Sequence, residues 1–271
     1  MNLANAFDFS GKTVVVTGGC GVLCSAMARG FAEHGANVVL LDRLAERGIK
    51  CADEIGPQAM AVYGDVLDRE ALVEAAEQVR EHFGPASILI NCAGGNRAEA
   101  TTSEERSFFD LPPDVLSDVV SLNLMGTIMP TQVFGRVMAE QGEGAIINIS
   151  SMSAFRPMTR VPAYSAAKAA VSNFTMWLAV NVAQDFSPGV RVNALAPGFF
   201  LTGQNRYLLI DDETGDMTQR GQDILNHSPM GRFGTPEDLI GPVLWLASPA
   251  AAFVTGVVLP VDGGFNVYAG V

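Results

Sequence analysis

A glycine-rich turn between an apolar run and a helical pattern is the feature that most constrains the fold of this chain. Residues 12–17 form a short run rich in β-branched side chains, which predicts a buried strand. The turn Gly18-Gly19-Cys20-Gly21 follows directly. A helical pattern then extends over residues 22–34. Strand, glycine turn and helix in this order form the start of a dinucleotide-binding fold, where the backbone approaches a pyrophosphate at the helix N-terminus. A plain βα turn without a ligand is the alternative.

The rest of the chain repeats the alternation of strand and helix. Alternation of this kind indicates right-handed βαβ units and a parallel sheet. We therefore predict an α/β fold: one domain over residues 1–271, with a Rossmann-type doubly wound parallel sheet of about seven strands and helices on both faces. The expected strands are 12–17, 37–41, 59–63, 87–90, 145–151, 190–195 and 256–261, and the expected helices include 22–34, 44–55, 68–83, one from 112, 164–186 and 235–246.

Composition excludes several classes of protein. Of the 271 residues 48% are apolar and 17% charged, which indicates a globular chain. The net charge of −12 and the lack of a basic stripe argue against nucleic acid as a partner. No signal peptide or membrane span is recognisable, so we expect a cytoplasmic protein that does not bind membranes. A mean hydropathy of +0.24 then predicts a large core extended by subunit interfaces.

The four cysteines, Cys20, Cys24, Cys51 and Cys92, lie in unlike contexts. Few scattered cysteines are typical of reduced thiols in a cytoplasm. Cys20 and Cys24 are four residues apart, which leaves a metal or redox role open, but no second cysteine or histidine cluster completes a site. We predict small buried thiols and no metal.

Acidic residues follow two expected strands at the edge where parallel sheets bind ligands. Asp42 lies roughly twenty residues beyond the glycine turn, where a carboxylate can hold a ribose hydroxyl and repel a 2′-phosphate. This favours NAD over NADP. Arg43 could accept the 2′-phosphate of NADP, but we interpret it as a solvated surface charge. Asp65 could bind an adenine amine or simply cap the next helix.

Tyr164 and Lys168 are spaced as neighbours on one face of a helix. A nearby ammonium lowers the pKa of a phenol, which makes the pair a plausible acid/base unit, although such a pair is usually an ordinary helix contact. Ser150-Ser151 ends the preceding strand at the ligand edge, and Asn123 lies among apolar neighbours in the helix that begins at Pro112-Pro113. A buried amide of this kind needs partners, either structural ones or those of a polar relay.

Taken together, these motifs resemble the classical short-chain dehydrogenases/reductases over essentially the whole chain. The matching set is Thr17-Gly18-Gly19, Asp65, Asn91-x-Ala93-Gly94, Asn123, Ser151, Tyr164-x-x-x-Lys168 and Pro197-Gly198. The resemblance implies that Tyr164 exchanges a proton, Lys168 lowers its pKa and holds the nicotinamide ribose, Ser151 binds the reacting oxygen, and Asn123 holds a water. It also implies a cofactor site built from Gly18, Cys20, Gly21, Val22, Leu23, Asp42, Arg43, Asp65, Val66, Asn91, Ala93, Gly94, Tyr164, Lys168, Pro197, Gly198, Phe200 and Thr202.

Two positions depart from the pattern of that family. Val22 and Cys24 stand where glycine is usual, and a β-branched Val22 should hinder close approach of the backbone. Gly21, one residue earlier, can take over that role.

Within the family, several stretches resemble the D-mannonate oxidoreductase (fructuronate reductase) branch. They are Gly94-Gly95-Asn96, Thr131-Gln132-Val133-Phe134, Pro197-Gly198-Phe199-Phe200-Leu201-Thr202, Gln204-Asn205-Arg206 and Pro229-Met230-Gly231-Arg232-Phe233-Gly234. This implies a sugar-acid substrate, D-mannonate or D-fructuronate, beneath a lid at about 199–229. Expected substrate contacts are Asn96, Ser153, Arg156, Phe199, Gln204, Asn205 and Arg206, with Arg206 preferred for the carboxylate and a structural arginine as the alternative.

The resemblance also implies a homotetramer, built through the long central helices and the last strand. Two other functions stay open. One is a gluconate-type or polyol dehydrogenase of the same family, and the other is a non-catalytic regulator that senses NAD.

Overall fold

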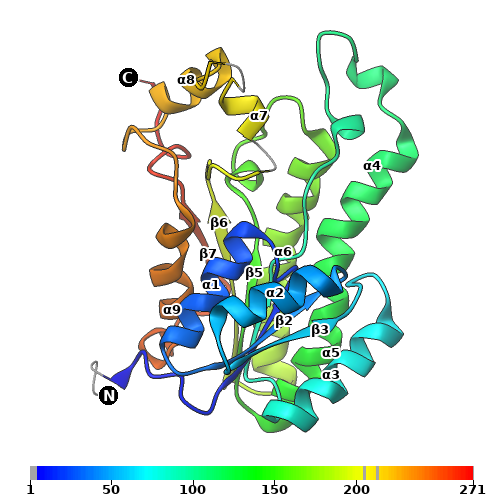
Figure 1. Ribbon diagram of the computed structural model, residues 1–271, viewed down its shortest axis with the longest axis vertical. Helices are drawn as coiled ribbons and strands as arrows, with labels where there is room; N and C mark the ends of the chain where they lie inside the picture. The colour runs from blue at the N-terminus through cyan, green and yellow to red at the C-terminus, as the bar shows by residue number, and fades with distance from the viewer. Residues whose placement is uncertain (1–4, 204–205, 212–213, 271) are drawn as a thin grey trace.

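A computed structural model describes residues 5–203, 206–211 and 214–270 (Figure 1). Its centre is a seven-stranded sheet in which every strand runs parallel to its neighbours, in the order β3-β2-β1-β4-β5-β6-β7. The strands are β1 Thr13–Thr17, β2 Asn37–Asp42, β3 Ala59–Tyr63, β4 Ile88–Asn91, β5 Gly144–Ile149, β6 Val190–Pro197 and β7 Val258–Val261. The predicted strand count and parallel order are confirmed.

Helices cover both faces of the sheet, as predicted. The main helices are α1 Val22–Glu33, α2 Ala45–Ile55, α3 Arg69–Phe83, α4 Pro113–Val120, α5 Gly126–Gln141, α6 Pro162–Asp185, α7 Arg206–Leu209, α8 Gln219–Asn226 and α9 Ile240–Ala247. Short 3-10 turns are η2 Ala98–Ala100, η3 Phe108–Asp110, η5 Met152–Ala154, η6 Pro236–Leu239 and η7 Pro249–Ala251. A π-helical turn, η4 Ser121–Met125, joins α4 to α5.

Alternating side chains of the strands divide the core into two layers. Val14 and Val16 pack with Phe31 of α1 and Val243 of α9 on one face, where α2 also lies. Val15 points to the opposite face, which α3, α5 and α6 cover. This alternation follows from the period of two in a strand, and burial on both faces explains the continuous apolar runs of the sequence.

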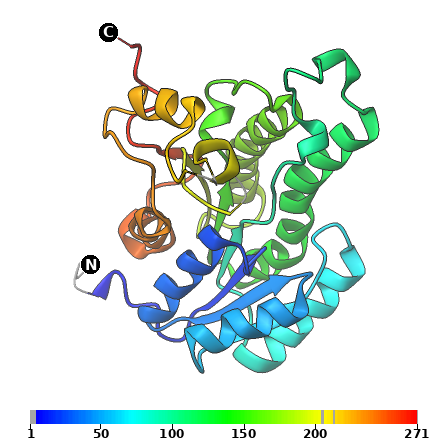
Figure 2. The ribbon, with the colours of Figure 1, turned by 45° about the horizontal axis from the view of Figure 1, so that its top comes forward.

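Side chains cap two of the helical elements at their N-termini. The Asp68 carboxylate accepts hydrogen bonds from the amides of Glu70 and Ala71 at the start of α3. Thr235 and Asp238 form a reciprocal capping box at η6. Figure 2 looks towards the carboxyl edge of the sheet, with α7 and α8 on one side and the segment before α4 on the other. The polar residues singled out from the sequence gather at this edge.

Candidate active site

A cleft of about 570 Å³ lies along the carboxyl edge of the sheet. Its walls come from the turn after β1 and from the ends of β2 to β6. All but one of the residues predicted to hold a cofactor line it: Gly18, Cys20, Gly21, Val22, Leu23, Asp42, Arg43, Asp65, Val66, Ala93, Gly94, Tyr164, Lys168, Pro197, Gly198, Phe200 and Thr202. The exception is Asn91, whose side chain lies beneath the cleft.

The glycine turn brings two walls of the cleft into contact. Gly18 has a left-handed backbone (φ +62°), and a Cβ there would lie 2.8 Å from the Cα of Ala93. Gly21 caps α1 without a side-chain hydrogen bond, which leaves the first amide groups of the helix open to an anionic group. Val22, in place of a glycine, is 44% exposed on the cleft. The turn therefore fits the pyrophosphate of a dinucleotide.

Asp42 fixes the glycine turn to the end of β2. Its carboxylate accepts hydrogen bonds from the amides of Cys20 (3.2 Å) and Leu44 (3.0 Å). Arg43 lines the cleft beside it, and so does Arg47, which the sequence analysis did not select. A signal for Arg47 existed, because it lies one helical turn beyond Arg43.

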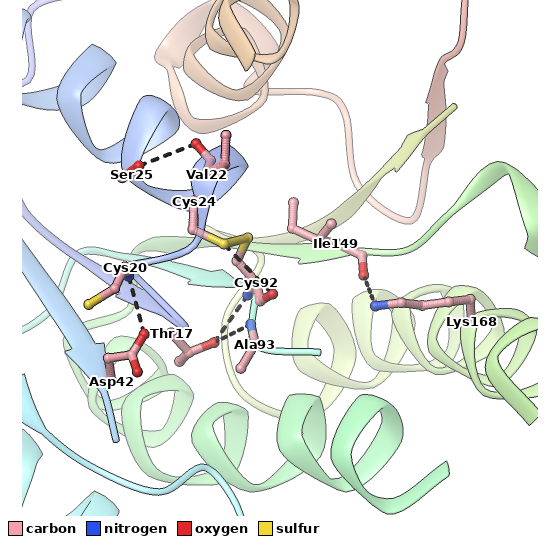
Figure 3. The surroundings of a disulfide bond; sticks show 10 residues. All are labelled: Thr17, Cys20, Val22, Cys24, Ser25, Asp42, Cys92, Ala93, Ile149 and Lys168. Atoms are coloured by element: carbon pink, nitrogen blue, oxygen red, sulfur yellow. Dashed lines mark hydrogen bonds between the residues drawn. A yellow bond between two sulfur atoms is a disulfide. The ribbon is translucent and has the colours of Figure 1, made fainter. Parts of the chain in front are cut away.

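Tyr164 and Lys168 project from the first turns of α6 into the same cleft as Ser151. The Lys168 Nζ donates a 2.8 Å hydrogen bond to the carbonyl of Ile149 (Figure 3). It also lies 5.6 Å from the centre of the Tyr164 ring. Ser151 lines the same cleft as Tyr164, and its side chain acts to lower the pKa of the phenol. A phenol, a hydroxyl and an ammonium therefore meet at one place, which suits proton transfer to an oxygen.

The pKa of Tyr164 differs from the expectation. Burial raises it, and the neighbouring Ser151 side chain opposes this effect only in part. Lys168 was expected to lower it, but its ammonium is bonded to the Ile149 carbonyl and lies at the ring of Tyr164. Burial also lowers the pKa of Lys168 to about 8, so its amine loses part of its positive charge slightly above neutral pH.

Asn123 lies behind these residues and is completely buried. Its side-chain amide donates to the carbonyls of Gly95 (2.7 Å) and Val119 (2.8 Å) and accepts from the Gly95 amide (3.2 Å). A Cβ on Gly94 would lie 2.6 Å from the Asn123 Oδ1 and 3.3 Å from the Lys168 Nζ. The π-helical turn η4 thus positions the Asn123 amide so that it holds the loop after β4 against Lys168. The water relay through Asn123 stays a prediction.

A buried polar chain runs beneath the cleft. Asn91 and Asn148 are paired in register on β4 and β5, and the Asn91 Nδ2 donates to the Asn148 Oδ1 (2.9 Å) and to the Thr131 Oγ1 (2.8 Å). The Asn148 Nδ2 donates in turn to the Thr175 Oγ1 (2.9 Å). This chain ties α5 and α6 to the strands under the catalytic residues. Asn91 therefore supports the cleft from below and does not line it.

The cysteines were predicted to be reduced thiols, and for two of them this is wrong. Cys24 and Cys92 form a disulfide across the floor of the cleft, with their Cα atoms 6.1 Å apart (Figure 3). No sequence motif predicts this bond, because the two cysteines are 68 positions apart and only the fold brings them together. Cys20 and Cys51 are free. Burial and the charge of Asp42 raise the pKa of the Cys20 thiol to about 12.

The residues predicted to bind substrate are less concentrated. Arg156 and Arg206 are exposed on the segment after β5 and at the start of α7, and Phe199 packs against Phe265 (5.2 Å between ring centres). The Asn96 side chain donates to Arg97 O and to the Thr101 Oγ1 within its own loop. None of these lines the cofactor cleft. Gln204 and Asn205 lie outside the described residues.

Ser153 lines a second cavity, of about 490 Å³, together with Ser165 and Arg160. The hydroxyls of Ser153 and Ser165 are buried without a partner among the described residues. Arg160 has a left-handed backbone (φ +77°), which the amide of Thr102 supports by donating to its carbonyl (2.9 Å). This cavity lies next to the catalytic residues in sequence but shares none of its lining with the cofactor cleft.

Two arginines missed by the sequence analysis meet beside this cavity. Arg220 of α8 donates to the Thr159 Oγ1 (3.3 Å), next to Arg160. Burial and then the charge of Arg160 lower the pKa of Arg220, and within the described part of the chain neither arginine pairs with a carboxylate. No sequence pattern links them, since the two arginines are 60 positions apart in the chain. Arg232 pairs with Asp238 of η6 (2.6 Å).

Neither a metal centre nor a spanning helix can be built from the described side chains. Within residues 5–203, 206–211 and 214–270, no three or more histidine, cysteine, aspartate or glutamate side chains are grouped to hold a metal ion. The helices described are also too short or too polar to cross a membrane.

Known proteins resemble this chain over its full length. Residues 22–266 match the family described as "Enoyl-(Acyl carrier protein) reductase". An uncharacterised oxidoreductase of Bacillus subtilis, UxuB, is 51% identical over 97% of this chain and 98% of its own length. A galactitol 2-dehydrogenase (L-tagatose-forming) of Cereibacter sphaeroides is 36% identical over 99% of this chain and 100% of its own length. A crystal structure from Haemophilus influenza with bound NAD, provisionally described as a D-mannonate oxidoreductase, is 46% identical, covers both chains fully and has a TM-score of 0.92.

Proposed function

We propose that this chain, which belongs to the short-chain dehydrogenase/reductase family and is thereby an oxidoreductase, interconverts the alcohol and ketone of a sugar acid. D-mannonate and D-fructuronate are the proposed pair, with NAD as the cofactor. The observation that carries the proposal is that Ser151, Tyr164 and Lys168 share one cleft with the glycine turn. The name of the Haemophilus relative supports the substrate.

The cofactor would be held by residues already gathered on the cleft. The turn from Gly18 to Leu23 would hold the pyrophosphate, Asp42 the adenosine ribose, and Lys168 the nicotinamide ribose. When bound, the nicotinamide supplies or accepts the hydride. The chain itself orients the two reactants and manages the proton.

Tyr164 would exchange the proton of the reacting oxygen. Ser151 and Tyr164 line the same cleft, so both hydroxyls can converge on one substrate oxygen and stabilise its developing charge. Because burial raises the pKa of Tyr164, the phenol is the stable form, which suits a proton donor in ketone reduction. Oxidation in the opposite direction needs the charge of Lys168 and of the oxidised nicotinamide to favour the phenolate.

The surroundings of the second cavity support an anionic substrate, although the whole chain carries a charge of −12. Arg156 and Arg160 lie on the segment between β5 and α6, and Arg220 reaches that segment from α8. Local arginines reverse the field at a site and bind carboxylates through paired N–H groups. Arg206, the preferred carboxylate ligand from the sequence, is exposed at the start of α7 and remains a candidate.

The reaction is tested by following NADH oxidation with a panel of ketouronates, ketogluconates and simple ketones. We expect turnover with D-fructuronate and weak or no turnover with ketones that lack a carboxylate. Activity confined to apolar ketones or acyl thioesters would rule out the sugar-acid assignment. The same assay with NADPH tests the preference for NAD, since Arg43 and Arg47 beside Asp42 could favour the phosphorylated cofactor.

The arginines are distinguished by single substitutions. Arg220→Gln and Arg160→Gln should each raise the KM for D-fructuronate about tenfold, the loss of roughly one charge-assisted contact, without raising the KM for NADH. Arg156→Gln and Arg206→Ala complete the series, and Arg136→Gln on the exposed face of α5 is the control. An unchanged KM for all four site variants would contradict the proposed role of these arginines in binding the carboxylate.

A neutral polyol is the second candidate substrate. The similarity to a galactitol 2-dehydrogenase favours it, because that relative acts on an uncharged substrate and matches the full chain. Oxidation of galactitol that outpaces oxidation of D-mannonate would select this alternative.

A cytoplasmic homotetramer remains our expectation for the assembly. Exposed apolar side chains follow one face of α6, where Trp177 is 59% and Val180 57% exposed, close to Met176. A face of this kind is typical of an interface, which sedimentation equilibrium would reveal as a mass four times that of the 28.6 kDa chain.

A further inference from the structure

The Cys24–Cys92 disulfide joins the two walls of the cleft that a dinucleotide would contact. Cys24 is the third residue of α1, just after the glycine turn, and Cys92 directly follows β4. Both line the cleft, between the turn at Cys20 and the loop at Ala93 (Figure 3). Its position separates this bond from an ordinary structural cross-link, because it lies where the cofactor has to fit.

We propose that Cys24 and Cys92 form a redox-active pair whose oxidation state sets the affinity for the dinucleotide, with the oxidised form binding more tightly. The inference rests on the proposed cofactor but not on the proposed substrate. The cross-link holds the start of α1 and the loop after β4 at a fixed spacing on either side of the cleft. Fixing a site in its binding geometry increases affinity because less ordering is needed on binding.

Reduction of the disulfide separates the two sulfur atoms, and the start of α1 moves away from the loop after β4. Bonded sulfurs lie about 2 Å apart, whereas separate atoms in contact need roughly 3.5 Å or more. The loop after β4 is anchored, since the amides of Cys92 and Ala93 both donate to the Thr17 Oγ1 (3.1 Å each). The start of α1 has no side-chain cap at Gly21. The displacement therefore falls on the amide groups that would bind the pyrophosphate.

The chemistry is thiol–disulfide exchange with a small-molecule dithiol. Cys24 is buried and Cys92 is partly exposed on the cleft, so an external thiolate attacks the Cys92 sulfur. The bond between the two cysteines breaks, and Cys24 leaves with the electron pair and takes a proton. The second thiol of the reagent then displaces Cys92, which also takes a proton, and a reagent disulfide is released. Two electrons pass from the dithiol to the protein; a small-molecule disulfide reverses the reaction.

The remaining thiols do not interfere with this pair. Cys20 lies on the same cleft, but burial and the charge of Asp42 keep its thiol protonated, and only a thiolate exchanges with a disulfide. Cys51 lies on α2, away from the lining of the cleft. The redox state of the cleft is thus that of Cys24 and Cys92.

Binding and redox state are coupled in both directions. A ligand that prefers the oxidised protein must make the disulfide harder to reduce by the same factor. The dinucleotide would also cover the cleft from which Cys92 is attacked. NAD should therefore protect the disulfide, at equilibrium as well as kinetically.

The test compares NAD binding by the oxidised and the dithiothreitol-reduced protein in titration calorimetry, with thiols counted by alkylation and mass spectrometry. We expect a Kd about tenfold lower for the oxidised protein, within the usual range of coupling between sites. In a dithiothreitol redox buffer, saturating NAD should lower the reduction potential of the pair by the matching amount, about 30 mV for a tenfold effect.

Variants separate this pair from general effects of the reductant. The double variant Cys24→Ser, Cys92→Ser should bind NAD as the reduced protein does and should not respond to dithiothreitol. Cys51→Ser should behave as the unmodified chain does. Equal affinity in both states, tighter binding after reduction, or four free thiols under oxidising conditions would each overturn the proposal. Failure to bind NAD in either state would contradict the proposed cofactor itself, whatever the substrate.

Discussion

The two sides of the carboxyl edge are built in different ways. On the catalytic side, Lys168 is 4% exposed, Asn123 is fully buried, and both are held by hydrogen bonds to the backbone. On the substrate side, Arg156 and Arg206 are exposed, and the ion pairs nearby, such as Arg232 with Asp238, lie at the surface. From this contrast we expect the proton chemistry to belong to the buried elements, and the choice of substrate to belong to loops that can vary without disturbing the sheet.

If this contrast is right, the largest effect comes from the phenol. Tyr164→Phe removes the proposed proton donor and leaves the ring that packs beside Lys168. We expect kcat to fall about 10³-fold, the range for a general acid or base, while the Kd for NAD changes little. Steady-state kinetics and NADH fluorescence titration measure the two. A variant that keeps most of its activity would move the chemistry away from the rigid side, and unchanged function in cells would revive the non-catalytic regulator.

A pH titration of stability tests how completely the catalytic side is buried. The folded pKa of Lys168 is lowered to about 8, below its unfolded value of about 10.4. Between these values the unfolded chain binds more protons, so the free energy of unfolding should rise with pH, by an amount on the order of 3 kcal/mol. Urea denaturation from about pH 7 to pH 10 measures it.

The control for this titration is Lys168→Met, which should lose the rise. Cys20 acts in the opposite sense, because its raised pKa makes stability fall once the unfolded thiol ionises. Tyr164, whose pKa is also raised, acts the same way only above about pH 10. Both groups remain in the variant, so the difference between the two proteins isolates Lys168. Parallel curves would mean that this ammonium is solvated.

Adding a methyl group at Gly94 tests how closely the loop after β4 packs against Asn123. Gly94→Ala places a Cβ 2.6 Å from the Asn123 Oδ1, and we expect about 2 kcal/mol lower stability together with reduced kcat. Gly241→Ala in α9 is the matched control, because a Cβ there meets no atom within 4 Å and a helical alanine is favoured over glycine. Equal melting temperatures for the two variants would show that the loop after β4 yields.

The smallest effect is expected on the substrate side. Asp238→Asn weakens the pair with Arg232 and the capping box at η6, which should cost about 1 kcal/mol because both groups are partly exposed. The pKa of Asp238 is lowered to about 2, mainly by Arg232, so this stability is present near neutrality and lost as the pH falls towards 2. Thermal melts and kcat should both stay close to those of the unmodified chain; a large loss of activity would erase the contrast.

The sequence predicted the rigid side well because its signals are local. Strand periodicity, the glycine turn and the spacing of Tyr164 and Lys168 each depend on neighbouring residues, and the fold follows from their order. The cleft then gathers the predicted cofactor residues except Asn91. Asn91 points below the cleft because its register on β4 pairs it with Asn148 on β5.

What the sequence could not predict depends on contacts between distant segments. The Cys24–Cys92 disulfide and the approach of Arg220 to Arg160 both join segments at least 60 residues apart, and neither has a motif. The direction of the pKa shift at Tyr164 also depended on where the ammonium of Lys168 points, which spacing along a helix does not decide.

The amide pair under the cleft has a consequence for how the sheet assembles. Asn91 and Asn148 face α5 and α6, where Thr131 and Thr175 meet them. If β4 slipped by one residue against its neighbours, its side chains would exchange faces, and the Asn91 amide would enter the apolar layer under α1 and α9. An unpaired buried amide costs roughly 1–3 kcal/mol. The pair therefore penalises misaligned sheets during folding, in which Tyr164 and Ser151, the proposed catalytic residues, would not come together.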